Sequence, residues 1–236
     1  ALIHKGHQSF VISGGGVLVD ELTQCGAKHY EIPVHIKSLR TLSLAKRLSE
    51  TISSIDPDIV HVRSRMPAWV NYRAFKMLQK KPLLVSTFHG LYSFPIYSKV
   101  MSFVDHSIAI SKTVERYILE NYKLDKGDIT VIPRGCDPLE FNNEVINPVD
   151  KANIIEEFPQ IVGKKVLTIP GRITKWKGVA EFIDLLSLLD DNYHGLIVGP
   201  TAKSKKKYLN KLQHKVSSLN LDCLLYTSDA ADDLLC

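Results

Sequence analysis

Residues 166–178 read Val166-Leu-Thr-Ile-Pro-Gly-Arg-Ile-Thr-Lys-Trp-Lys-Gly178 and indicate the fold class most clearly. Residues 165–169 are rich in apolar and β-branched side chains and predict a buried strand. Gly171 follows that strand closely, and residues 178–189 repeat their apolar side chains at helical spacing. A strand, a glycine-containing loop and a helix together form the repeating unit of a parallel α/β sheet.

The same alternation of strands and helices runs through most of the chain. Further strands are predicted at residues 9–13, 29–33, 58–62, 83–87, 106–110, 129–132 and 195–198. Helices are predicted at residues 17–22, 39–54, 67–79, 97–103, 112–122 and 203–219, with Ser111 as an N-cap. Residues 137–149 are rich in Pro, Asn and acidic side chains and predict a linker. We therefore expect two Rossmann-like domains with doubly wound parallel sheets, residues 1–145 and 146–222.

The composition is that of an ordinary globular protein. Of the 236 residues, 44% are hydrophobic and 23% are charged, which is too apolar for a disordered chain. No apolar run approaches the roughly 20 residues that span a bilayer. The net charge of +5 is too small to indicate a nucleic-acid partner. Cys25 and Cys136 lack partners at metal-ligand spacing and are interpreted as thiols in a reducing compartment.

Ligands of parallel α/β sheets bind at the carboxyl ends of the strands, so the residues that follow each strand are the candidates. The glycine run that contains Gly15 and Gly16 could present backbone N–H groups to an anion, or could be a tight turn. It is not the dinucleotide-binding fingerprint, because Val19 stands where the third glycine belongs. Both interpretations of the run stay open.

Two further post-strand segments carry polar side chains. His89, followed by Gly90, is placed to hydrogen-bond a substrate hydroxyl or phosphate, or to transfer a proton. Arg63 and Arg65 could hold an anionic acceptor or could be solvated turn residues. By contrast, the carboxylates of the Asp-Pro-Asp sequence at 56–58 precede a strand, so we expect no metal site there.

The loop after the strand at 165–169 is the most informative site. Arg172, Lys175 and Lys177 stand between the strand and the start of the next helix. A guanidinium, two ammonium groups and a helix N-terminus suit a diphosphate. The lysines of residues 203–219 are better explained as a solvated helix face, with contact at a membrane surface as the alternative.

These residues resemble glycosyltransferase family 4. The stretch 167–178 resembles the donor-site motif of the family, and so do the stretches Val131-Ile-Pro-Arg-Gly-Cys-Asp137 and Asp105-His-Ser-Ile-Ala-Ile-Ser111. Asp58-Ile-Val-His-Val-Arg-Ser-Arg65 and Ser86-Thr-Phe-His-Gly-Leu-Tyr92 resemble the amino-terminal half of the family. The resemblance covers nearly all of residues 1–222.

The resemblance implies the GT-B fold, in which an acceptor domain and a nucleotide-sugar domain face each other across a cleft. It implies retaining, metal-independent transfer without a cofactor, in which Arg172 and Lys177 neutralise the leaving diphosphate. His89 would contact the transferring sugar or the diphosphate from the acceptor side. The donor-binding residues that it implies are Arg172, Lys177, Arg134, Gly135, Gly171 and Gly199. The acceptor-binding residues are Gly15, Gly16, Arg63, Arg65, His89 and Gly90.

The function expected from the resemblance is transfer of a sugar from a nucleotide diphosphate to an envelope glycan or glycolipid, in the bacterial cytoplasm or at the inner face of the membrane. A GT-B sugar-nucleotide epimerase or phosphorylase is one alternative. A non-enzymatic, two-lobed module that binds sugars or anions is another. We expect a nucleotide sugar and a glycan acceptor as partners and no nucleic acid.

Two family features are missing from the sequence, namely the opening strand with its glycine-rich loop and the paired-glutamate motif of the donor site. Residues 223–236 do not resemble the family and look like a translated sequencing adapter, as found at the ends of metagenomic reads. We therefore expect a fragment with a complete first domain except for one strand, an incomplete second domain and a non-native tail. Such a fragment is expected to be inactive.

Overall fold

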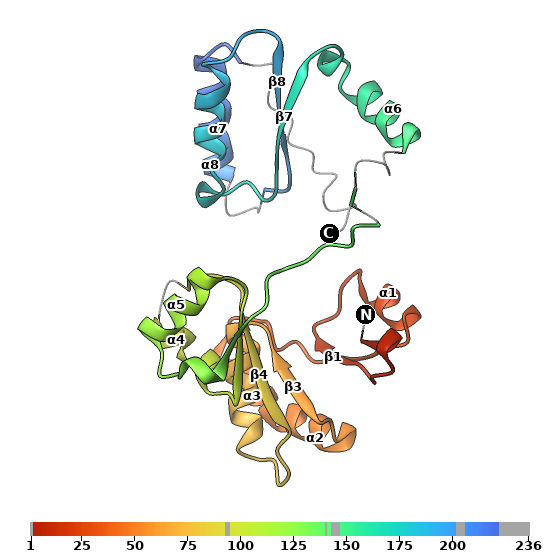
Figure 1. The fold of residues 1–236 in the computed structure, drawn as a ribbon, viewed down its shortest axis with the longest axis vertical. Helices are drawn as coiled ribbons and strands as arrows, with labels where there is room; N and C mark the ends of the chain where they lie inside the picture. Colours follow the sequence, from red (N-terminus) through yellow and green to blue (C-terminus); the bar gives the residue numbers. More distant parts are fainter. Residues whose placement is uncertain (1, 93–94, 140, 143–146, 202–205, 222–236) are drawn as a thin grey trace. The chain divides into compact units, whose positions relative to one another are not determined.

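The computed structural model describes residues 2–92, 95–139, 141–142, 147–201 and 206–221 of the chain (Figure 1). It divides into two compact units, Ala1–Cys136 and Asp137–Cys236. The division falls at the beginning of the segment predicted as a linker, whereas the predicted domain boundary follows residue 145. All strand pairs among the described residues are parallel, which confirms the α/β class.

The first unit is built on a four-stranded parallel sheet in the order β3-β4-β5-β6. Its strands are β3 (Ile59–Val62), β4 (Leu83–Phe88), β5 (His106–Ala109) and β6 (Ile129–Val131). The connections between them contain α3 (Arg65–Phe75), α4 (Pro95–Ser98), η3 (Lys99–Ser102), α5 (Lys112–Asn121) and η4 (Lys126–Asp128). Because the strands are parallel, their carboxyl ends meet at one edge, and the segments that follow them share that edge.

A separate two-stranded parallel sheet precedes this one in the first unit. It consists of β1 (Phe10–Ser13) and β2 (Lys28–Glu31), and the neighbouring helices are η1 (Ile3–Lys5), α1 (Val19–Gln24), η2 (Leu39–Leu44) and α2 (Ala45–Ile55). The helix predicted at 39–54 therefore begins as a 3-10 helix. The Ser38 hydroxyl accepts a hydrogen bond from the Arg40 N–H, and Leu39 is 86% exposed, so this turn does not pack its first apolar residue.

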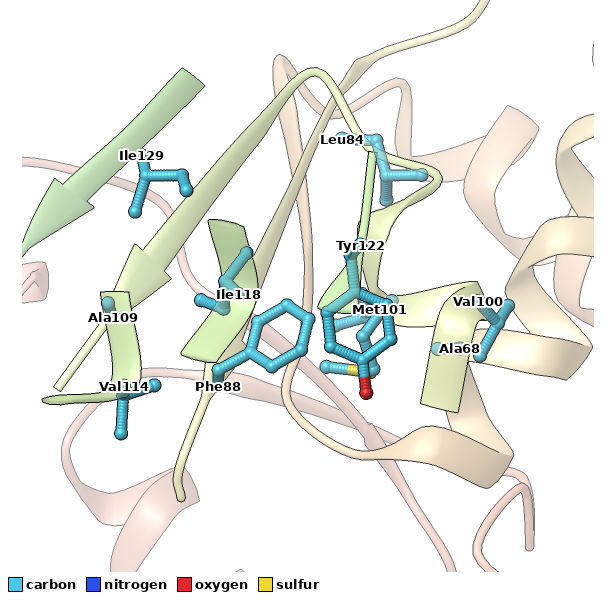
Figure 2. Close-up of a cluster of buried hydrophobic side chains, with 11 residues drawn as sticks. Ala68, Leu84, Phe88, Val100, Met101, Ala109, Val114, Ile118, Tyr122 and Ile129 are labelled. Atoms are coloured by element: carbon cyan, nitrogen blue, oxygen red, sulfur yellow. The ribbon is translucent and has the colours of Figure 1, made fainter. Parts of the chain in front are cut away.

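The core of the first unit lies between the β3–β6 sheet and the helices that connect its strands. Phe88, at the end of β4, and Ile118, on α5, are fully buried. Figure 2 shows the ring of Phe88 beside that of Tyr122, and the two ring centroids are 5.4 Å apart. Burying each large apolar side chain contributes about 1.5–3 kcal/mol. The residue that precedes His89 is therefore fixed in the core.

The second unit contains a two-stranded parallel sheet of β7 (Lys165–Pro170) and β8 (Tyr193–Val198). Its helices are α6 (Pro148–Glu157), η5 (Pro159–Ile161), η6 (Lys175–Lys177), α7 (Val179–Leu186) and α8 (Lys206–Ser218). Helices α7 and α8 pack together beside the sheet (Figure 1). Ile183, Ile197, Leu212 and Val216 form the core between them.

Helix α6 has no counterpart in the sequence-based expectation. Asn147 caps it through a hydrogen bond from the Val149 N–H to the Asn147 side chain, and Pro148 occupies its first turn. None of its residues is buried, so it contributes no side chain to the core. The segment 223–236, expected to be a non-native tail, lies outside the described residues. None of the helices in the described ranges is long and apolar enough to cross a membrane.

Candidate functional site

The first unit has a pocket at the carboxyl ends of the β3–β6 strands. Its volume is about 480 Å³. The polar residues that line it are Arg63, Thr87, His89, Arg134 and Gly135, and the apolar ones are Ile108, Ile110 and Ile132. These residues follow or end four different strands, as expected for a ligand site in a parallel sheet.

A hydrogen bond joins two of the predicted site residues in this pocket. The guanidinium Nη2 of Arg134 lies 3.0 Å from Nδ1 of His89. Because a guanidinium only donates hydrogen bonds, Nδ1 accepts and the ring proton of neutral His89 is on Nε2. Burial lowers the pKa of His89, and the charges of Arg63, Arg134 and His61 lower it further. His89 is therefore a neutral hydrogen-bond donor at pH 7, with Nδ1 already occupied.

A second histidine near this edge of the sheet escaped the sequence analysis. Nε2 of His61 lies 2.7 Å from the Thr87 hydroxyl. Withdrawal of the ring from water lowers the pKa of His61, and the neighbouring charge of Arg63 lowers it further. His61 and Thr87 sit inside predicted strands and are 26 positions apart. The pairing of β3 with β4 brings them together. The sequence feature that could have pointed to this contact is the presence of a polar side chain within each predicted strand.

The pocket carries positive charge without a carboxylate to balance it. The ion pairs found among the described residues join Lys46 to Glu50, Lys80 to Asp56 and Lys215 to Asp184. None of them involves Arg63 or Arg134. Among the residues that the structure describes, no acidic side chain lines the pocket. Two guanidinium groups are thus available at its wall.

Arg65 lies outside the pocket, although it was predicted with Arg63 as an acceptor-binding residue. Its guanidinium carbon is 5.0 Å from the ring centroid of Tyr92 and 5.3 Å from that of Tyr97. Its Nη1 donates to the Ser98 hydroxyl at 3.4 Å. Tyr92 in turn accepts a hydrogen bond from the backbone N–H of His89 at 3.4 Å. Arg65 therefore braces the segment that follows β4, where its charge stacks on aromatic rings.

The glycine run of the first unit forms a turn away from the pocket lining. Gly15 and Gly16 have φ angles of +82° and +133°, which only glycine adopts readily. The Gly15 N–H donates to the Ser13 hydroxyl at 3.2 Å. Helix α1 begins at Val19, not directly after the glycines as predicted, so the run does not form its N-terminus. Gly90 also does not line the pocket, although it adjoins His89.

In the second unit, the loops after β7 and β8 meet through two glycines. A side chain on Gly199 would place its Cβ 2.1 Å from the carbonyl oxygen of Gly171. The Gly171 N–H donates to the Val198 carbonyl at 2.8 Å. Gly171 and Gly199 have φ angles of +132° and +152°. Only glycine allows this close approach with this backbone conformation. The close contact therefore explains why glycine occupies positions 171 and 199.

Lys177 extends over the same loop. Its Nζ is 4.6 Å from the ring centroid of Trp176, which is 71% exposed, and 3.8 Å from the position of a Cβ on Gly171. Gly178, with φ +73°, is the N-cap of α7 and contributes no side-chain cap. Arg172 and Lys177 are exposed and, within the described residues, neither is paired with a carboxylate.

The second unit thus brings Gly171, Lys177 and Gly199 together beside Arg172. The cations and the uncapped helix N-terminus make this loop receptive to an anion. Arg134 and Gly135, predicted with this donor set, belong to the first unit and line its pocket.

Among the residues that the structure describes, no three His, Cys, Asp or Glu side chains are grouped to hold a metal ion. Asp56, one of the two carboxylates considered for metal binding, pairs with Lys80 at 2.7 Å. It also ends α2 in the left-handed conformation. Asp56 therefore has a structural role at the end of this helix.

The sequence of the first unit matches a family model. The model for Glycosyltransferase Family 4 matches residues 1–139, which is more than half of the chain. The chain belongs to glycosyltransferase family 4. Within this family 4 chain, the match covers the pocket residues Arg63, His89, Arg134 and Gly135.

Individual proteins similar to the family 4 chain agree with this assignment. An uncharacterized glycosyltransferase of Methanocaldococcus jannaschii is 30% identical over 175 residues, which are 65% of this chain and 43% of that protein. The crystal structure of a glycosyltransferase from Rickettsia africae is 30% identical, with a TM-score of 0.78 over 96% of this chain and 61% of that one.

A structure of Anabaena HepE in complex with UDP-glucose shares the fold. It has a TM-score of 0.77 at 18% identity and covers 93% of this chain and 60% of that one. These structures confirm the predicted GT-B architecture. The family 4 chain spans less than two thirds of the length of each of these three proteins.

Proposed function

We propose that the protein transfers a sugar from a nucleotide diphosphate donor to a glycan or glycolipid acceptor, with retention of anomeric configuration. The observation that carries this proposal is the loop of residues 171–178. Within the described part of the chain, Arg172 and Lys177 form no ion pair there, and they precede the N-terminus of α7, which lacks a side-chain cap. Similar structures that hold UDP or UDP-glucose support a nucleotide-sugar donor.

The proposed mechanism is electrostatic. Cleavage of the sugar–phosphate bond leaves negative charge on the diphosphate, and fixed positive groups that meet this charge lower the barrier. Arg172 offers two parallel N–H groups to a phosphate, and Lys177 offers a mobile ammonium group. Together they would supply the neutralisation that a divalent metal supplies in other enzymes, so transfer should persist in the presence of a chelator.

We assign the acceptor to the pocket of the first unit. The Nε2–H of His89 is free to donate to the acceptor held in this pocket, since Nδ1 is occupied by Arg134. An acceptor of the bacterial envelope and action in the cytoplasm follow from the family resemblance alone. Membership of a glycosyltransferase family favours transfer over the epimerase and non-enzymatic alternatives.

The test is a transfer assay with a panel of nucleotide sugars and glycan acceptors, performed on the longer reading frame that we expect to surround this chain. Proton NMR of the product reports its anomeric configuration, and EDTA is present throughout. We expect the configuration of the donor to be retained. Arg172→Ala combined with Lys177→Ala should lower kcat by about 100-fold or more.

The matched control is Lys206→Ala combined with Lys207→Ala. These exposed lysines of α8 lie in the same unit, and their replacement removes the same charge. An inverted product would overturn the proposed stereochemistry. A rate that the Arg172 and Lys177 substitutions leave unchanged would overturn the proposed donor site.

A further inference from the structure

The pocket of the first unit has an excess of positive charge, which a neutral sugar would not neutralise. Arg63 and Arg134 line it, and the charge of each lowers the pKa of His89. Arg63 also acts on His61 in the same way. Like charges gathered without a counter-charge raise the free energy of the empty site, and an anion bound there would lower it.

The hydrogen-bond donors in this pocket fit one class of anion best. Arg134 uses one nitrogen on His89 and keeps further N–H groups for a ligand. The Nε2–H of His89 is a second donor, and the guanidinium of Arg63 is a third. They belong to three different post-strand segments, those after β3, β4 and β6. A phosphate monoester presents three terminal oxygens in three directions and carries up to two negative charges, whereas the acceptor sites of a carboxylate lie in one plane.

The apolar part of the lining strengthens these interactions. Ile108, Ile110 and Ile132 contribute side chains without hydrogen-bonding groups. On their side of the pocket they reduce the contact of a bound anion with water, while Ile132 is itself 50% exposed. They also suit the apolar face of a sugar ring that carries the phosphate.

We infer that the pocket formed by Arg63, His89 and Arg134 is a phosphate subsite for the acceptor, so that the acceptor is a phosphorylated glycan or glycolipid. This inference rests on the proposed function, because it takes the second unit to bind the donor. It adds the chemical class of the acceptor. The proposed anion-binding loop around Arg172 and Lys177 belongs to the other unit and consists of different residues.

The first experiment titrates three sugars into the 236-residue chain at pH 7.5 and follows the ring signals of His89 by NMR. The sugars are glucose 6-phosphate, glucuronate and glucose, which differ in the anionic group alone or lack one. We expect glucose 6-phosphate to bind at least about tenfold more tightly than glucuronate, and glucose to cause no shift. Equal affinity for the phosphate and the carboxylate, or no binding of the phosphate, would overturn the inference.

Substitutions then locate the bound phosphate. Arg63→Gln and Arg134→Gln should each weaken glucose 6-phosphate binding by about tenfold, because each removes a charge-assisted contact. Arg63→Lys keeps the charge without the fork and should weaken it less. Arg116→Gln, on the exposed side of α5, removes the same charge outside the pocket and should change nothing. An unshifted His106 ring signal serves as the check that each variant is folded. If both folded pocket variants bind glucose 6-phosphate as tightly as the parent, the phosphate binds elsewhere.

A competition separates this inference from the proposed function. UDP should bind the chain without displacing glucose 6-phosphate, and Arg172→Ala with Lys177→Ala should abolish UDP binding only. Displacement of glucose 6-phosphate by UDP would assign the pocket to the donor and contradict an acceptor subsite. Failure of UDP to bind, with glucose 6-phosphate still bound at Arg63 and Arg134, would contradict the proposed donor site instead.

Discussion

At the scale of single residues, His89 takes its chemical state from its neighbours. Arg134 occupies Nδ1, and the charges of Arg63, Arg134 and His61 add to burial in lowering the pKa of the ring. The sequence indicates that His89 follows a strand, but neither its tautomer nor its partner. Both depend on Arg134, which is 45 residues away along the chain and arrives through the pairing of β4, β5 and β6.

The first prediction concerns this pair. Arg134→Gln should raise the pKa of His89 toward its ordinary value, because the substitution removes a positive charge that disfavours the protonated ring. An NMR titration of the histidine ring signals measures the pKa. Arg116→Gln, which removes a charge outside the pocket, should leave it unchanged. A pKa that stays constant or falls in Arg134→Gln would show that the two side chains do not interact in solution.

The second residue-scale prediction concerns the crossing of two glycines in the second unit. Gly199→Ala should weaken the β7–β8 pair by about 2–3 kcal/mol, because the new Cβ would lie 2.1 Å from the Gly171 carbonyl oxygen and φ is +152°. Gly163→Ala is the matched control, with φ +74° and open space around the position, and should cost about 1 kcal/mol. Hydrogen exchange of the β8 amides measures the free energy of opening. Similar losses in both variants would mean that the close approach does not matter.

At the scale of elements, the sequence predicts most of the strands because their apolar residues are continuous. Strand β4, for example, coincides with its prediction at 83–87 to within one residue. Helix α6 was missed because Val149, Ile154 and Ile155 make only a weakly periodic apolar pattern, next to the segment predicted as a linker. The 3-10 helix η2 was predicted as part of an α-helix because apolar spacing does not distinguish the two types. The polar contact between His61 and Thr87 depends on strand register, which the sequence does not specify.

The N-terminus of α5 provides the element-scale prediction. The Ser111 hydroxyl accepts a hydrogen bond from the Val114 N–H at 3.2 Å, which confirms the predicted N-cap. Ser111→Ala should lower the free energy of unfolding of the first unit by about 1 kcal/mol, because the Val114 N–H loses its partner. Ser111→Asp, which can also cap, should retain most of the stability. Urea unfolding, monitored by hydrogen exchange of the α5 amides, measures the free energy of unfolding. Equal losses of this free energy in Ser111→Ala and Ser111→Asp would contradict the role of Ser111 as an N-cap.

At the scale of the whole molecule, the sequence predicts two α/β units and a linker between them, since the strand–helix alternation stops after residue 136 and resumes later. Each candidate site lies within one of the two units. Arg63, His89 and Arg134 belong to the first unit, and Arg172 and Lys177 belong to the second. Motif resemblance predicted Arg134 as a donor residue, but only the sheet order of the first unit shows that it adjoins His89.

Both units are predicted to lose stability at acidic pH. The pKa values of His61 and His89 in the first unit, and of His194 in the second, are lowered mainly by burial. Below pH 6.5 the unfolded chain therefore binds protons that the folded chain does not, so the free energy of unfolding falls as the pH drops from 7.5 to 5.5. Thermal melts across this range measure the effect. His61→Gln should reduce the pH dependence, and an unchanged dependence would contradict this role of His61.

Calorimetric titration of UDP into the longer reading frame, and into its variant with Arg172→Ala and Lys177→Ala, tests the assignment of the donor site most directly. We predict one UDP site in the parent chain. The double variant should bind at least about 100-fold more weakly, because two charge-assisted contacts to the diphosphate are lost. Lys206→Ala with Lys207→Ala should bind like the parent. Equal affinity of the parent and the Arg172 and Lys177 variant, or no binding to the parent, would contradict the assignment of this loop as the donor site.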